Sequence, residues 1–126
     1  MSLSKESLRA LVAAILAVNS YPIWRVQELL PSLEKAGLLD PEHVAMLDMG
    51  TLTVKLAEAG YDRGMLTCRL AERLADLMRT VERGQLDELE RLLTTGDKKK
   101  ATELLLKVRG IGPTVARSVW ALLETI

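Results

Sequence analysis

Apolar residues recur every three or four positions along most of the chain, which is the spacing of one face of a helix. The first such stretch covers residues 4–18, with Ser4 as its N-cap and an apolar face made by Leu8, Leu11, Val12, Ile15 and Leu16. The longest covers residues 63–83, where the apolar stripe is made by Leu66, Leu70, Leu74 and Leu77. No segment alternates apolar and polar residues as a strand does. The pattern predicts an all-α chain of seven or eight helices.

Proline, glycine and short polar residues mark where the other helices begin and end. The second helix is expected to end or kink at Pro31. Asp40, followed directly by a proline, predicts the start of a short third helix. Thr51 is expected to cap the next helix, which closes at Gly60. A short helix over residues 85–93 then precedes a final helical pair.

The composition is that of one globular domain spanning residues 1–126. The chain is 48% hydrophobic and 27% charged, with 3% aromatic residues and no Phe. Leu, Ala, Val and Met must therefore fill the core, which suits packed helices. No apolar run approaches the about 18 residues that cross a bilayer, so no membrane partner is expected.

Single cysteine and histidine residues limit the cofactors that the chain could hold. Cys68 is the only cysteine, which excludes an internal disulfide and an iron–sulfur cluster held by several cysteines of this chain. His43 is the only histidine, so a histidine-based metal site is not expected. We expect Cys68 to be buried in a helix, His43 to be exposed at a helix start, and the protein to be cytoplasmic.

The most informative stretch is VRGIGPTVA, residues 108–116, which connects the amphipathic segments 102–107 and 113–123. Gly110 and Gly112 flank one apolar residue and permit a tight hairpin. Pro113 has its φ pre-set for a first helical turn, so the last helix begins directly at the hairpin. The free N–H groups of the glycines and of that helix then form a concavity that suits a phosphate.

Charge is distributed unevenly, although the net charge is zero. Residues 97–126 carry six basic and three acidic side chains, so this end is positive and the first 96 residues are negative by the same amount. Lys107, Arg109 and Arg117 lie around the hairpin. The run 98–100 is lysine only, which equally suits a solvated helix start. Zero net charge argues against strong nonspecific binding to a polyanion.

The hairpin resembles the helix-hairpin-helix motif of DNA repair proteins. The motif's pattern, hydrophobic–x–Gly–hydrophobic–Gly–x–x–x–Ala, is met by Val108, Gly110, Ile111, Gly112 and Ala116. The resemblance implies a helix-hairpin-helix at residues 97–125 that binds the DNA backbone through Lys107, Arg109, Gly110, Ile111, Gly112, Thr114 and Arg117. It also implies a monovalent cation held by the carbonyls of Leu106, Val108 and Ile111. A tight turn between two helices, with no ligand, is the simpler alternative.

The rest of the chain is similar to the endonuclease III-like (HhH-GPD) DNA glycosylase superfamily. Residues 11–20, 37–41 and 52–61 and the long helix that follows match that family's segments in the same order, so the resemblance covers residues 8–125. It implies the six-helix barrel domain that forms one wall of the base-binding cleft. Asn19 matches the polar residue that helps to fill the gap left by a flipped base, although a loop asparagine explains it equally simply.

Three departures from that family affect the expected chemistry. Thr114 stands where the lyase-competent branch has a nucleophilic lysine, and threonine cannot form a Schiff base. The family's essential Asp lies beyond the last helix, past Ile126, and its cluster cysteines are absent. The expected function is therefore a DNA-binding domain of base-excision-repair type without catalytic residues. Such a domain would be a fragment of a longer enzyme, a stand-alone homologue, or one half of an enzyme whose other half is a separate chain. Its ligand would be duplex DNA, bound weakly and without sequence specificity.

Three alternatives stay open from the sequence. In the first, the chain is an active DNA glycosylase, or a fragment of one, that uses another carboxylate such as Asp62 or Glu124. In the second, it is a DNA-binding domain like that of family X DNA polymerases, which residues 84–113 resemble. In the third, it is a helical protein-interaction module.

Overall fold

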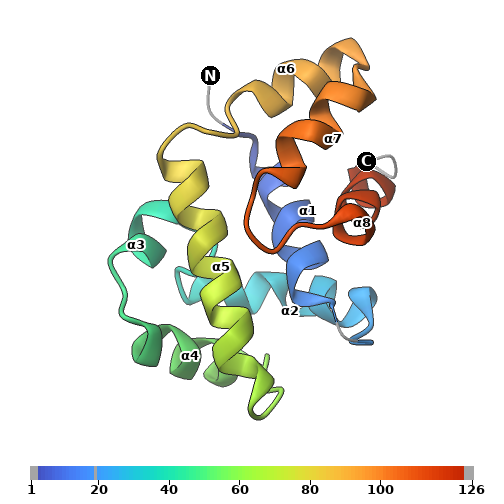
Figure 1. The fold of residues 1–126 in the computed structure, drawn as a ribbon. Coiled ribbons are helices and arrows are strands. Elements are labelled where there is room, and N and C mark those ends of the chain that lie inside the picture. The colour runs from blue at the N-terminus through green and yellow to red at the C-terminus, as the bar shows by residue number, and fades with distance from the viewer. Residues whose placement is uncertain (1–2, 19, 124–126) are drawn as a thin grey trace.

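The computed structural model describes residues 3–18 and 20–123 and is helical throughout its regular structure (Figure 1). Within these residues eight helices follow one another and form a single small domain: α1 (Lys5–Leu16), α2 (Ile23–Lys35), α3 (Pro41–Ala45), α4 (Met49–Glu58), α5 (Leu66–Glu82), α6 (Glu88–Thr95), α7 (Lys98–Leu106) and α8 (Pro113–Leu123). The all-α prediction is confirmed, and the number of helices is as expected.

Helix α1 lies at the centre of the fold and packs against α2, α5 and α8 (Figure 1). Every residue from Ala10 to Leu16 is buried, so this part of the helix is apolar on all sides. Such a helix is stable only inside a core. The alanines at positions 10, 13 and 14 leave room for neighbouring helices to approach closely. Helix α5 packs on the other side against α3 and α4.

Two of the three predicted N-caps are confirmed, and the third is shifted. The Ser4 and Asp40 side chains accept hydrogen bonds from first-turn amides of α1 and α3. At α4 the cap is Asp48, whose Oδ1 accepts from the Thr51 amide at 2.8 Å. Thr51 is therefore inside the helix, and the expectation that it caps α4 is wrong. Both residues suit a cap, but only Asp48 stands three residues before an amide in need of an acceptor.

Several predicted helix ends are also moved by a few residues. Helix α1 ends at Leu16 where the pattern ran to residue 18, and α6 spans Glu88–Thr95 where residues 85–93 were expected. Gly60 follows the end of α4 with a φ of +110°, as its position predicts.

Pro31 does not end α2, because the helix continues to Lys35, so of the two expected effects of Pro31, an end or a kink, the end is wrong. Val26 and Leu33, on either side of Pro31, are both fully buried. Their packing holds the segment in one helix and offsets the hydrogen bond that proline cannot donate. Pro31 itself is exposed, and so is Gln27, whose carbonyl has lost its donor but faces water.

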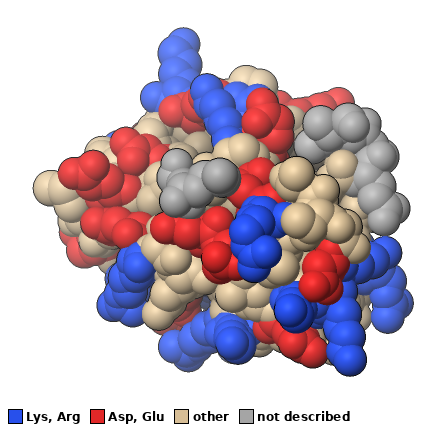
Figure 2. Space-filling model, turned by 90° about the horizontal axis from the view of Figure 1, so that it is seen from above, with Lys and Arg blue, Asp and Glu red and all other residues tan. Residues whose placement is uncertain are grey.

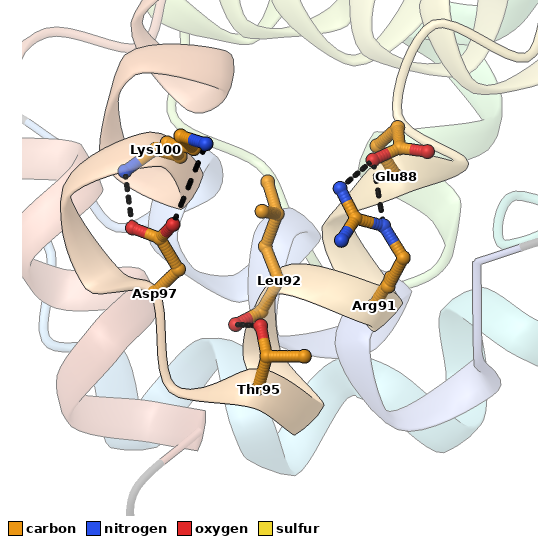
Figure 3. Close-up of polar contacts among 6 residues, drawn as sticks. All are labelled: Glu88, Arg91, Leu92, Thr95, Asp97 and Lys100. Carbon is orange, nitrogen blue, oxygen red and sulfur yellow. Dashed lines mark hydrogen bonds and ion pairs between the residues drawn. The ribbon is translucent and has the colours of Figure 1, made fainter.

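Local polar contacts fix the turn between α6 and α7 (Figure 3). The Asp97 side chain caps α7 by accepting from the Lys100 amide at 3.2 Å, and the Thr95 hydroxyl donates to the Leu92 carbonyl at 3.3 Å. These contacts define where α6 ends and where α7 begins.

None of the helices formed by residues 3–18 and 20–123 combines the length and the apolar character needed to cross a membrane.

Candidate nucleic-acid interface

A short hairpin of residues 107–112 connects α7 to α8 and runs beside α5 (Figure 1). The Val108 amide donates to the Leu105 carbonyl at 3.0 Å, and the Ile111 amide donates to the Val108 carbonyl at 3.1 Å. The side chains of Val108 and Ile111 are both 4% exposed and belong to the hydrophobic core. These two apolar residues anchor the hairpin, so the residues between and after them are held at the surface.

The two glycines of the hairpin have different structural roles. Gly110 has a φ of +94°, a conformation that L side chains rarely adopt, and a Cβ added there would lie 2.7 Å from Cδ of Arg73. Gly112 has no positive φ, and a Cβ added there would meet nothing within 4 Å. Gly110 is thus required by the turn, whereas Gly112 leaves open space in front of α8.

The N-terminus of α8 begins directly behind that open space. Gly112 has no side chain to cap the helix, although its carbonyl accepts from the Ala116 amide at 2.9 Å. Pro113 has no N–H, so the first helical amides are those of Thr114 and Val115. Amides of a first turn have no partner within their own helix, and the helix dipole adds positive charge there. Pro113 and Thr114 are exposed, so an anion could approach this end of α8.

Exposed basic residues flank this opening along the chain. Lys107 and Arg109 precede Gly112, Arg117 follows Pro113 by about one turn of α8, and all three are exposed. Nε of Arg109 lies 3.8 Å from Oδ2 of Asp76 on α5, and Arg109 keeps a side-chain exposure of 76%. The guanidinium is thus held near α5 by a weak contact and is still accessible to a ligand.

Lys98, Lys99 and Lys100 are exposed but belong to another part of the surface. They form the first turn of α7, and the hairpin follows its last turn, about 12 Å away along the helix. Nζ of Lys100 lies 4.0 Å from Asp97 Oδ2, and Nζ of Lys98 lies 5.3 Å from the centre of the Trp120 ring. Figure 2, which views the molecule from above, shows positive and negative side chains interspersed over that face.

Three residues of α5 beside the hairpin were not identified from the sequence. The side chain of Arg73 lies against Gly110, and the Asp76 carboxylate contacts both Arg109 and, at 3.4 Å, Nη1 of Arg79. These residues precede the hairpin by about thirty positions, and only the packing of α5 against residues 107–112 brings them together. Their spacing of three along α5 shows that they share a face, but not what that face meets.

The remaining candidate residues have less to connect them with a site. Asn19 and Glu124 lie outside the residues that the structure describes. Asp62 is exposed, and its Oδ1 accepts from the Gly64 amide at 3.0 Å, which is a local turn contact. Among the proposed cation ligands, the Val108 carbonyl already accepts the Ile111 amide, which leaves one lone pair for an ion.

Two minor expectations are wrong. Cys68 is exposed, because it lies two residues before Leu70 and therefore on the opposite side of α5 from the core. His43 is half-buried, and its ring lies against Gly37, where a Cβ would come within 2.7 Å of it. Within residues 3–18 and 20–123, no group of three or more His, Cys, Asp or Glu side chains could hold a metal ion.

A recess of about 330 Å³ opens beside the hairpin, between the end of α5, the segment that follows it and α7. Its lining residues are Thr80, Gln85, Leu86, Leu104, Lys107 and Val108. None of them is acidic, so this recess offers no carboxylate to a bound group.

Comparisons of the chain with protein-family models, with curated proteins and with solved structures find no match. Function is therefore inferred from the residues and geometry of the chain itself.

Proposed function

We propose that this protein is a DNA-binding module of helix-hairpin-helix type, in which the hairpin takes a backbone phosphate of duplex DNA. One observation carries the proposal. The uncapped start of α8 opens onto the empty space at Gly112, and the exposed cations Lys107, Arg109 and Arg117 lie within five residues of that glycine in the sequence. Helix N-terminal amides, a close backbone approach and flanking cations are what phosphate binding needs.

The residues divide into three roles in this proposal. Gly112 lets the phosphate approach, and the amides of Gly110, Gly112 and Thr114 donate to its oxygens, whereas those of Val108 and Ile111 are used within the turn. Gly110 and Ile111 hold the turn in shape, the first by its conformation and the second by its buried side chain. Lys107, Arg109 and Arg117 contribute long-range attraction that salt screens. A monovalent cation on the carbonyls of Leu106, Val108 and Ile111 would add positive charge next to the phosphate.

Binding of this kind is not sequence-specific, because the protein contacts only the DNA backbone. With few cations and zero net charge, the affinity is expected to be weak. The module fits base-excision repair, in the cytoplasm, together with a second chain or segment that supplies catalysis. Thr114 provides a hydroxyl where lyase chemistry needs an amine, and the recess beside the hairpin lacks a carboxylate.

The charge contribution is tested by binding a fluorescently labelled duplex of mixed sequence over a series of salt concentrations. The affinity should fall with salt, with a logarithmic slope of about −3 if the charges of Lys107, Arg109 and Arg117 each release one counterion. Lys107→Gln should reduce the magnitude of that slope by about 1. Lys35→Gln, an exposed change at the far end of α2, is the matched control and should leave the slope unchanged.

Absence of binding, or binding that salt does not affect, would contradict the DNA-binding proposal. It would favour a helical protein-interaction module. Equal losses in the two lysine variants would show that net charge matters but that the hairpin does not.

A further inference from the structure

Arg73 on α5 lies directly against the hairpin, although it is far from it in the sequence. A Cβ added at Gly110 would lie 2.7 Å from Cδ and 3.4 Å from Nε of Arg73. The aliphatic part of the side chain therefore covers the Cα of Gly110, and the guanidinium group begins at the edge of the hairpin. Arg73 is half-buried, which is how a long basic side chain packs its stem and exposes its charged end.

A nearby carboxylate on α5, that of Asp76, is already in contact with other cations. Asp76, one turn along α5, contacts Arg79 through Oδ1 and Arg109 through Oδ2. Among the residues that the structure describes, no carboxylate forms an ion pair with Arg73. Arg73 thus contributes a positive charge beside the hairpin without an ion-pair partner among residues 3–18 and 20–123.

Arg73 and Arg109 also lie on the same side of the hairpin. Arg109 reaches toward Asp76, and Arg73 precedes Asp76 by three residues on the same face of α5. Lys107 and the start of α8 lie along the rest of the turn. Cations are consequently present on the α5 side as well as on the α8 side of the hairpin.

We propose that Arg73 is a further DNA-binding residue, which contacts a second backbone phosphate next to the one held by the hairpin amides. This inference rests on the proposed function. It extends the binding surface from the hairpin onto α5, so that one strand would be held at two successive phosphates. Arg73 would also support the turn, because its stem packs on Gly110.

The experiment separates the charge of Arg73 from its packing. Arg73→Met keeps an unbranched apolar stem and removes the charge, whereas Arg73→Lys keeps the apolar stem and the positive charge. The labelled duplex is titrated over the same salt series, and thermal unfolding is followed for each variant. Arg25→Met, an exposed change at the start of α2, is the control for lowering the net charge by one.

Arg73→Met should weaken binding several-fold at low salt and reduce the magnitude of the salt slope by about 1. Arg73→Lys should keep the slope, and Arg25→Met should leave it unchanged. The inference would be overturned if Arg73→Met keeps the wild-type slope, or if Met and Lys weaken binding equally, since packing alone would then explain the effect. If the wild-type protein does not bind DNA at all, the proposed function itself fails. If Lys107→Gln lowers the slope and Arg73→Met does not, only this inference fails.

Discussion

The indole Nε1 of Trp120 donates a hydrogen bond to Oγ1 of Thr102 at 3.0 Å, and this contact joins α8 to α7. The two residues lie in the two helices that the hairpin connects. Val119, next to Trp120, is fully buried, whereas Trp120 is half-buried. Trp120 thus lies at the border of the buried face of α8. The hydrogen bond restrains the angle between the helices and therefore the shape of the hairpin.

Replacing Thr102 by Val should destabilise the protein by about 1–2 kcal/mol, because the part-buried indole N–H loses its acceptor. Chemical denaturation measures the free energy of unfolding. Thr94→Val is the matched control. The Thr94 hydroxyl donates to the Glu90 carbonyl on an exposed surface, so its loss should change stability by less than about 0.5 kcal/mol. Equal effects of the two substitutions would show that the contact between the helices contributes nothing of its own.

The two glycines of the hairpin should respond differently to substitution. Gly110→Ala should destabilise the protein by about 1–3 kcal/mol, because the residue has a positive φ and its Cβ would meet Arg73. Gly112→Ala should leave stability nearly unchanged, because its Cβ would enter open space. Thermal unfolding of the two variants makes the comparison. A larger loss for Gly112→Ala would mean that the turn is not the one described.

The stability of the protein should fall at alkaline pH because of Tyr61. Its side chain is fully buried, and its hydroxyl donates to the Leu16 carbonyl at 2.6 Å. Burial raises the pKa of this hydroxyl above its ordinary value, although the nearby Arg63 guanidinium acts in the opposite direction. The unfolded chain therefore loses this proton at lower pH than the folded protein. The stabilisation is complete below about pH 10 and is lost as the pH rises through the folded pKa.

Absorbance of the ionised phenol measures this titration directly. The chain has two tyrosines, so Tyr21→Phe isolates Tyr61. In that variant the phenol should ionise above the range of a free tyrosine, while Tyr61→Phe should remove this titration and destabilise the protein by about 1–2 kcal/mol. Ionisation of the Tyr61 phenol in the pH range of a free tyrosine would contradict its burial.

Much of the fold could be predicted from the sequence because its signals are local. Helical spacing identified the long apolar helices, and Ser4 and Asp40 were correctly identified as caps. That α2 continues past Pro31 could not be predicted, because the burial of residues on both sides of the proline is a tertiary effect. Thr51 was misjudged because two capping residues stand close together and only geometry selects Asp48.

The candidate site could be predicted only where it is continuous in the sequence. The hairpin glycines and the flanking cations are adjacent along the chain, so their pattern was visible. Arg73, Asp76 and Arg79 approach the hairpin because α5 packs beside it, and nothing in the spacing of residues 73–79 indicates that partner. Whether Gly112 faces open space also depends on the packed structure.

Base excision is not expected from this polypeptide alone. Excision requires a carboxylate placed at a flipped base, and lyase chemistry requires an amine there as well. The hairpin has no carboxylate, and Thr114, at the start of α8, offers a hydroxyl rather than an amine. Incubation with duplexes that carry uracil, oxidised pyrimidines, 8-oxoguanine, alkylated purines or abasic sites should release no base and break no strand. Release of a base that is lost in Asp62→Asn or Glu124→Gln would instead establish an active glycosylase.

Equilibrium binding of a labelled duplex to the wild-type protein and to Gly112→Val, at low salt, tests the central claim most directly. The valine side chain would fill the space in front of α8 without disturbing the core, so the circular dichroism of the two proteins should be the same. The wild-type protein should bind, and the variant should bind about tenfold more weakly or worse, a loss of about 1.4 kcal/mol or more, because the phosphate no longer reaches the amides. Equal affinities for the two folded proteins would show that the hairpin does not hold the DNA backbone.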